Sequence, residues 1–236
     1  MGDHVQADTC GHWPTTLRGE NYLLVVAVKG HELRFAFPMT TKSAGAVKGA
    51  MSVLHWLLKA IRRANNQQHE LSGWILETDQ GGEFDNRAIA GFLIRTSGIW
   101  RTVPTARHVA GAESAVRQVC EGIRTLLSAS GLPSTFWSFA AVSYCYNWNS
   151  RSELFRTWLK SENMLVRSFA FGELVDFVHA RHDKVGQKDL NKAQAKARPA
   201  AFLGPHWDSR KGCFVLYLSD AGTYAHVLVT LSLIHI

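Results

Sequence analysis

The residues best suited to chemistry lie in a short acidic, glycine-rich stretch. Residues 77–84 read ETDQGGEF, and the three residues before them, 74–76, are apolar. This order predicts that Asp79 lies at the C-terminal end of a strand, where the following glycines let the backbone turn and leave room for a ligand. A carboxylate in that position can face an open crevice and a phosphate-bearing molecule. The same stretch is also compatible with a plain turn followed by a helix N-cap.

Two other carboxylates are candidates to meet Asp79. Residues 4–11 read HVQADTCG, the pattern of a short strand, and carry Asp8. A polar loop that opens at Pro104 leads to Glu113, in the first turn of a long amphipathic helix. Divalent cations prefer oxygen ligands, and few carboxylates hold them when the substrate supplies phosphate oxygens. The three acids therefore point to metal-assisted phosphate chemistry, although their spacing alone does not decide it.

The elements expected to position these acids alternate between strands and helices. Apolar residues at helical spacing predict a core helix over residues 43–64, and another helix is expected over 136–149. Asp85 is expected to cap a short helix that runs through Ile94. The expected strands, the first two forming a hairpin, cover residues 22–28, 33–37, 99–103, 169–172, 174–178, 201–203, 214–218 and 224–229.

Composition narrows the class of protein. The chain has 236 residues, a formal net charge of +7 and a sequence pI of about 9.4. A basic balance of that size favours a polyanionic partner, and nucleic acid is the usual one. No apolar run approaches the roughly 20 residues needed to span a bilayer, so no membrane partner is expected. The four cysteines are widely separated and are interpreted as reduced intracellular thiols, because neither Cys10 with His12 nor His179 with His182 gives a full zinc-ligand set.

In their order along the chain, these residues resemble the integrase catalytic core of copia-type retrotransposons. The acidic part of the resemblance is Asp8 with residues 9–11 (TCG), then 78–84 (TDQGGEF), then 111–113 (GAE). The resemblance extends over nearly the whole chain through residues 131–133 (GLP), 136–137 (FW), Tyr146, Asn149, 201–204 (AFLG) and 211–212 (KG).

The resemblance implies an α/β fold in two parts. The first is a ribonuclease H-like mixed five-stranded sheet flanked by helices, expected over residues 1–155. A linker over 156–168 and a small Src-homology-three-like β-domain over 169–230 are expected to follow, with 231–236 as an extraneous tail. The chain is expected to be a fragment of a polyprotein that lacks the family's upstream zinc-binding segment.

The resemblance also implies a reaction. Asp8, Asp79 and Glu113 would be the catalytic residues and the ligands of two Mg²⁺ or Mn²⁺ ions. The enzyme would join the 3′ ends of the element's cDNA to target DNA, as a homo-oligomer, in the nucleus after assembly in a cytoplasmic particle. A catalytically decayed module for DNA binding or assembly is the alternative, and another ribonuclease H-like nuclease is a third interpretation that the C-terminal strands disfavour.

Five basic residues are candidate DNA ligands. Arg117 and Arg124 share one edge of their helix with Glu113, and Lys48 lies off the apolar stripe of the 43–64 helix. Lys188 and Lys192 belong to a lysine-bearing segment over residues 184–198. Solvated basic faces, and an ion pair between Glu113 and Arg117, are the alternatives.

Several positions depart from the family pattern. Gln80 and Ala110 stand where the family has asparagine, Ser114 where it has arginine, and His12 where it has proline. The loop before Glu113 is also shorter than usual. These departures keep the decayed-module alternative open.

Overall fold

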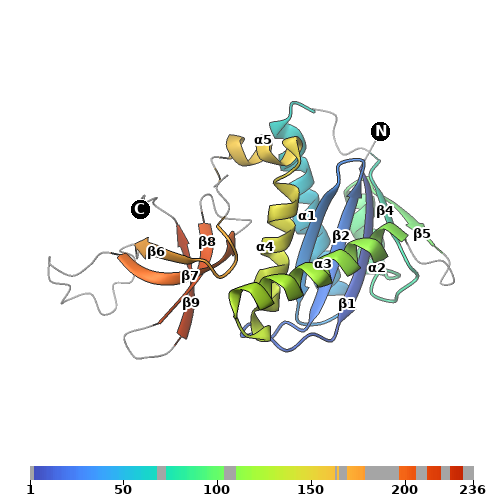
Figure 1. Cartoon of the computed structure of the whole chain (residues 1–236). Helices are drawn as coiled ribbons and strands as arrows, with labels where there is room; N and C mark the ends of the chain where they lie inside the picture. The colour runs from blue at the N-terminus through green and yellow to red at the C-terminus, as the bar shows by residue number, and fades with distance from the viewer. Residues whose placement is uncertain are drawn as a thin grey trace, which may run out of the picture.

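The computed structural model describes residues 3–67, 73–103, 110–162, 164, 169–178, 197–205, 212–218 and 224–230. Within them the chain forms two sheets (Figure 1), a five-stranded sheet in the order β3-β2-β1-β4-β5 and a four-stranded sheet in the order β6-β7-β8-β9. The strands of the first sheet are β1 (His4–Gly11), β2 (Tyr22–Lys29), β3 (Leu33–Met39), β4 (Ile75–Thr78) and β5 (Ile99–Thr102).

The first sheet has the ribonuclease H-like arrangement. β1, β2 and β3 form an antiparallel meander, whereas β4 pairs with β1, and β5 with β4, in parallel. β2 is apolar along nearly its whole length because helices cover both faces of the sheet at that position. The predicted fold class and the predicted hairpin are confirmed.

One face of the sheet is covered by α1 (Ala44–Ala64) and α2 (Arg87–Arg95). α1 begins at Ser43, whose hydroxyl accepts a hydrogen bond from the Ala46 N–H at 3.3 Å, and its apolar stripe is buried as predicted. α2 begins one residue later than expected, because the Asn86 side chain rather than Asp85 accepts the capping hydrogen bonds. α5 (Glu153–Ser161) packs Phe155 and Trp158 into the same core.

The other face is covered by α3 (Ala110–Ser130) and α4 (Trp137–Asn149), joined through a 3-10 turn at Ser134–Phe136. The Asn149 side chain accepts a hydrogen bond from the Arg34 N–H and donates one to the Arg34 carbonyl, both at 2.7 Å, which ties α4 to β3. Figure 1 shows α3 running in front of β1 and β2.

The second sheet consists of β6 (Leu174–Val178), β7 (Ala197–Pro205), β8 (Gly212–Leu218) and β9 (Tyr224–Thr230), all antiparallel. Leu203 of β7 and Leu216 of β8 belong to the same apolar cluster as α3 and α4. Residues 169–172 were expected to be a strand, but they lie in an irregular segment with a turn at Phe171 and Gly172.

The domain limits expected from the sequence remain predictions. α5 extends beyond residue 155 into the expected linker and packs on the first core. The expected tail, 231–236, lies outside the described residues. No helix in the described part of the chain is long and apolar enough to cross a membrane.

Candidate active site

Two of the three predicted acids lie on neighbouring parallel strands. β1 and β4 pair His4 with Ile75 and Gln6 with Glu77. Continued by two residues, this register brings Asp8 level with Asp79, which directly follows β4. Side chains alternate along a strand, so Asp8, like Cys10, projects toward the face that α3 covers, and the charge of Asp79 acts on it. The structure therefore brings Asp8 and Asp79 together at one edge of the sheet.

The electrostatics of Asp8 reflect this proximity. Burial raises the pKa of its carboxyl group, and the nearby charges of Asp79 and Glu83 raise it further. The Thr9 N–H, which donates to Asp8 Oδ1 at 2.7 Å, and the charge of Lys42 act in the opposite direction. The two acids repel each other when both are ionised, which is the condition that a bound cation relieves.

Glu83 is a third acid at this edge, and the sequence motif contained it without identifying its role. Thr9 donates its hydroxyl hydrogen bond to Glu83 Oε1 at 2.6 Å, and Lys42 Nζ lies 3.9 Å from the same oxygen. Glu83 thus connects the strand that carries Asp8 with the loop that carries Asp79. The signal available in the sequence was an acid four residues after Asp79 within one glycine-rich turn.

Gly81 leaves the space in which two of these carboxylates meet. A Cβ atom at Gly81 would lie 2.7 Å from Glu83 Oε2 and 3.1 Å from Asp79 Oδ1. The Gly81 N–H also donates to Asp79 Oδ1 at 3.1 Å. A Cβ at Gly82 would meet nothing within 4 Å. Of the two glycines predicted to keep bulk away, only the first has close neighbours.

Glu113 lies in the first turn of α3 with an exposed side chain. Two contacts fix α3 against β1 on either side of Asp8: Gly111 packs directly on the Gln6 side chain, and the sulfur atoms of Cys10 and Cys120 lie 4.0 Å apart. Glu113 therefore belongs to the stretch of helix that passes the end of the sheet where Asp8, Asp79 and Glu83 lie, which we call the acidic edge. Among the described residues, however, no three His, Cys, Asp or Glu side chains are grouped closely enough to hold a metal ion.

The residues of the pair nevertheless fit a divalent cation. Asp8 and Asp79 supply hard oxygen ligands of the kind that Mg²⁺ and Mn²⁺ prefer, and their mutual repulsion favours a positive charge between them. Two carboxylates suffice when phosphate and water complete the coordination.

The candidate DNA ligands are distributed over two faces. Arg117 and Arg124 are exposed on α3, about one and three turns after Glu113. Lys48 lies on α1, which covers the opposite face of the sheet from α3. Lys188 and Lys192 lie outside the described residues.

The residues considered as zinc ligands have other neighbours. His4 contacts Glu77, and His12 Nε2 lies 3.2 Å from the Tyr22 hydroxyl. The hydrogen bond between the two thiols raises the pKa of Cys10 and lowers that of Cys120. His179 and His182 lie outside the described residues.

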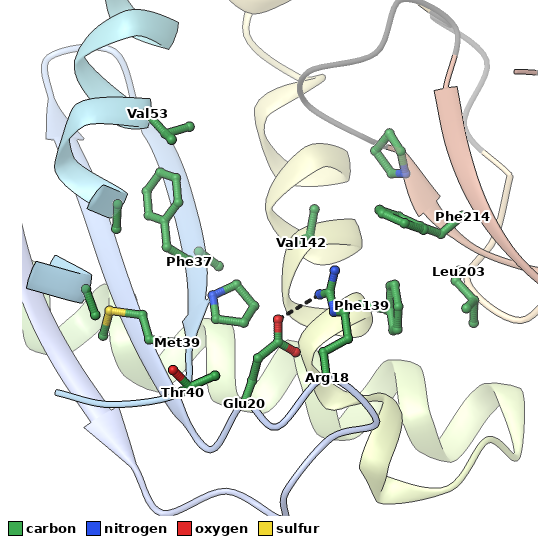
Figure 2. A pocket seen from close by; sticks show the side chains of 15 residues that line it. Arg18, Glu20, Phe37, Met39, Thr40, Val53, Phe139, Val142, Leu203 and Phe214 are labelled. Atoms are coloured by element: carbon green, nitrogen blue, oxygen red, sulfur yellow. Dashed lines mark ion pairs between the residues drawn. The ribbon is translucent and has the colours of Figure 1, made fainter. Parts of the chain in front are cut away.

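A separate pocket of about 530 Å³ opens between β3, α1, α4 and the second sheet. In Figure 2 its walls are mainly apolar, and Arg18 and Glu20 form an ion pair at 2.9 Å. The Arg18 guanidinium also stacks 4.7 Å from the centre of the Phe139 ring. Neither Asp8 nor Asp79 lines this pocket, so it is distinct from the acidic edge.

Comparison with known proteins finds sequences and solved structures that are similar to this chain. The Gag-Pol polyprotein of yeast transposon Ty1-PR2 (Saccharomyces cerevisiae) is 24% identical over 127 residues, 52% of this chain and 7% of the polyprotein. The Pol polyprotein of tobacco transposon TNT 1-94 (Nicotiana tabacum) is 29% identical over 139 residues, 55% of this chain and 10% of the polyprotein. No protein-family model matches the chain.

One structural neighbour is the catalytic core domain of BIV integrase. It shares 15% sequence identity, with a TM-score of 0.44 over 67% of this chain and 95% of that domain. The chain spans a tenth or less of the length of the two polyproteins. Its segment from β1 to α5 carries the ribonuclease H-like sheet. Over about half of its length, the chain is a distant homologue of Ty1/copia-type Gag-Pol polyproteins.

Proposed function

We propose that this chain is the catalytic core of a copia-type retrotransposon integrase, a polynucleotidyl transferase that joins cDNA 3′ ends to target DNA. The main support is the parallel pairing of β1 with β4, which sets Gln6 opposite Glu77, two residues before Asp8 and Asp79, in a chain distantly homologous to Ty1/copia polyproteins. Its partners would be element and target DNA and further copies of the same chain. The reaction would take place in the nucleus.

In this proposal Asp8 and Asp79 hold two Mg²⁺ or Mn²⁺ ions, and Glu113 completes the set of carboxylates. When bound, such ions activate a water or a 3′-hydroxyl and stabilise the leaving oxygen of an in-line displacement at phosphorus. Two groups of the chain favour ionised Asp8 by lowering its pKa, the Thr9 N–H and Lys42, and the Gly81 N–H holds Asp79 Oδ1. Arg117 and Arg124, exposed on α3, would bind DNA phosphates beside the acids.

The function can be tested with Asp79→Asn. In a strand-transfer assay with duplex oligonucleotides and Mn²⁺, joining should fall at least about 100-fold, because the reacting centre is deprived of one ligand. Binding of the same duplex, measured by fluorescence anisotropy, should stay within about two-fold, a change worth under 1 kcal/mol. Joining at the unsubstituted rate by Asp79→Asn would refute the assignment.

A non-catalytic DNA-binding or assembly module is the second candidate. It is favoured by the finding that, in the described part of the chain, the three acids are not grouped as a metal site, and by Ser114 and Gln80 where the family has other residues. Titration with Mn²⁺ separates the two candidates. Binding that disappears in Asp8→Asn supports the enzyme, whereas no binding at millimolar Mn²⁺ supports the module.

A further inference from the structure

Glu83 occupies an unusual position for an acid so close to two others. It contributes negative charge to the surroundings of Asp8 and raises that residue's pKa, which is unfavourable in the absence of a cation. Its side chain is mostly shielded from solvent, with 17% exposed. Such an arrangement persists when specific contacts offset the repulsion, and two such contacts are present.

The first contact is with β1. The Thr9 hydroxyl donates to Glu83 Oε1 at 2.6 Å, and Thr9 is the residue next to Asp8 in the chain. Because neighbouring side chains on a strand point to opposite faces, Thr9 points toward the α1 side of the sheet and Asp8 toward the α3 side. Glu83 therefore holds β1 from the face opposite to the Asp8 carboxylate.

The second contact is with Lys42, just before α1. Its Nζ lies 3.9 Å from Glu83 Oε1 and its charge lowers the pKa of Asp8. The other Glu83 oxygen, Oε2, borders the space above Gly81 that Asp79 Oδ1 also borders. One carboxylate thus connects β1, the segment before α1 and the Asp79 loop.

We infer that Glu83 is a positioning residue that fixes Asp8 and Asp79 relative to each other through the Thr9 hydroxyl. This inference deepens the proposed function and rests on it, because the pair must bind a cation for the positioning to matter. Glu83 acts from the far face of β1, and the described acids include no three-membered metal group. Glu83 is therefore not assigned as a direct ligand of the cation.

The test is a double-mutant cycle measured by Mn²⁺ binding. The 236-residue chain is titrated with Mn²⁺ by isothermal calorimetry, without DNA, for Thr9→Val, Glu83→Ala and the double variant. Each single variant should weaken Mn²⁺ affinity about ten-fold or more, the usual effect of removing a partner that orients a ligand. The double variant should be no weaker than either single one, because both changes remove the same hydrogen bond.

Glu83→Gln distinguishes positioning from charge. A glutamine keeps an oxygen that can accept the Thr9 hydrogen bond, so its loss of affinity should be less than about five-fold, the effect of one partly exposed charge. Equal losses of affinity in Glu83→Gln and Glu83→Ala, with no effect of Thr9→Val, would overturn the inference and assign Glu83 a purely electrostatic effect. Thermal melting of every variant identifies losses of affinity that come from unfolding.

Asp85→Asn and Asp79→Asn are the controls. Asp85 is an exposed acid two residues after Glu83, and its removal should leave Mn²⁺ affinity unchanged. If Asp79→Asn abolishes Mn²⁺ binding while Thr9→Val and Glu83→Ala leave it unchanged, the inference fails and the proposed function stands. If the unsubstituted chain binds no Mn²⁺, both fail.

Discussion

At the scale of single residues, the pKa of Asp8 reflects a balance between groups that disfavour its ionised form and groups that favour it. Burial and the charges of Asp79 and Glu83 raise the pKa of Asp8, while Lys42 and the Thr9 N–H lower it. The unfavourable contributions are larger, because the net shift is upward from the ordinary value of 3.8. The site therefore costs the metal-free protein stability in exchange for an arrangement that suits a cation.

This cost gives a prediction for Asp8→Asn. The folded state binds the Asp8 proton more tightly than the unfolded state, so its contribution to stability is fully present below about pH 4 and is lost as pH rises through the raised pKa. At pH 7 without metal, Asp8→Asn should therefore melt at a higher temperature than the unsubstituted chain, by about 2–4 °C for each kcal/mol of repulsion removed.

The measurement is differential scanning calorimetry at pH 7 and near pH 3.5. The advantage of Asp8→Asn should shrink at the lower pH, where Asp8 is mostly protonated in both states. Saturating Mn²⁺ at pH 7 should stabilise the unsubstituted chain and not the variant. A variant that melts lower than the unsubstituted chain at pH 7 in the absence of metal would contradict this account.

At the scale of elements, the site depends on one turn between β4 and α2. The Asp79 side chain accepts from the Gly81 N–H at 3.1 Å, and the Asn86 side chain donates to the Glu83 carbonyl at 2.8 Å while it caps α2. These bonds fix the direction in which the Asp79 and Glu83 carboxylates leave the backbone. The turn and the helix N-cap that the sequence offered as the plain interpretation are therefore both present, and the ligand-facing role of Asp79 stays a prediction.

A pair of glycine substitutions tests this turn. In Gly81→Ala the new Cβ would meet both carboxylates, at 2.7 Å from Glu83 Oε2 and 3.1 Å from Asp79 Oδ1. The carboxylates are the mobile ends of side chains, so we expect a change in melting temperature of less than about 4 °C, corresponding to roughly 1 kcal/mol. Their displacement should weaken Mn²⁺ binding, measured by calorimetry, by about ten-fold.

Gly82→Ala is the matched control. Its Cβ would meet nothing within 4 Å and its side chain would face solvent, so Mn²⁺ affinity should remain that of the unsubstituted chain. Equal effects of the two substitutions would mean that the turn needs backbone freedom at both positions and that the crowding above Gly81 is irrelevant.

At the scale of the whole molecule, exposed basic side chains lie on the same side of the first sheet as Asp8, the side that α3 covers. The chain has a net charge of +7, and α3 presents Arg117 and Arg124 to solvent next to the face that carries the acids. Lys48, on α1, lies on the opposite face. A single duplex that reaches Asp8 and Asp79 would therefore contact the α3 arginines rather than Lys48.

The salt dependence of duplex binding tests whether the α3 arginines contact DNA phosphates. Replacing Arg117 and Arg124 by alanine should weaken duplex binding and reduce the slope of log K against log salt by about 0.9 for each phosphate that the variant no longer neutralises. Arg156→Ala removes an exposed arginine on α5 and should leave the slope unchanged. Anisotropy titrations at several salt concentrations give the slopes, and an equal reduction in Arg156→Ala would indicate that binding follows net charge rather than the α3 surface.

The sequence by itself determined the elements and the family resemblance. Period-two and helical patterns located β1, the β2–β3 hairpin, α1 and α3, because amphipathic periodicity is a local property that burial on one face imposes. The distant homology to Ty1/copia-type polyproteins confirms the family resemblance, while the roles of Asp8 and Asp79 stay predictions. Two predictions were wrong: Asp85 as the cap of α2, and a strand over residues 169–172. The cap was missed by one residue because capping depends on which side chain reaches the free N–H groups.

Only the tertiary structure decided which acids meet. Asp8 and Asp79 come close because β1 and β4 pair in parallel in the register that sets Gln6 opposite Glu77, a contact between residues far apart in the chain. Glu83 joined them through the Thr9 hydroxyl, and Glu113 stayed exposed on α3. Local sequence cannot specify such distances, because they follow from the long-range packing of strands and helices rather than from the residues next to each acid.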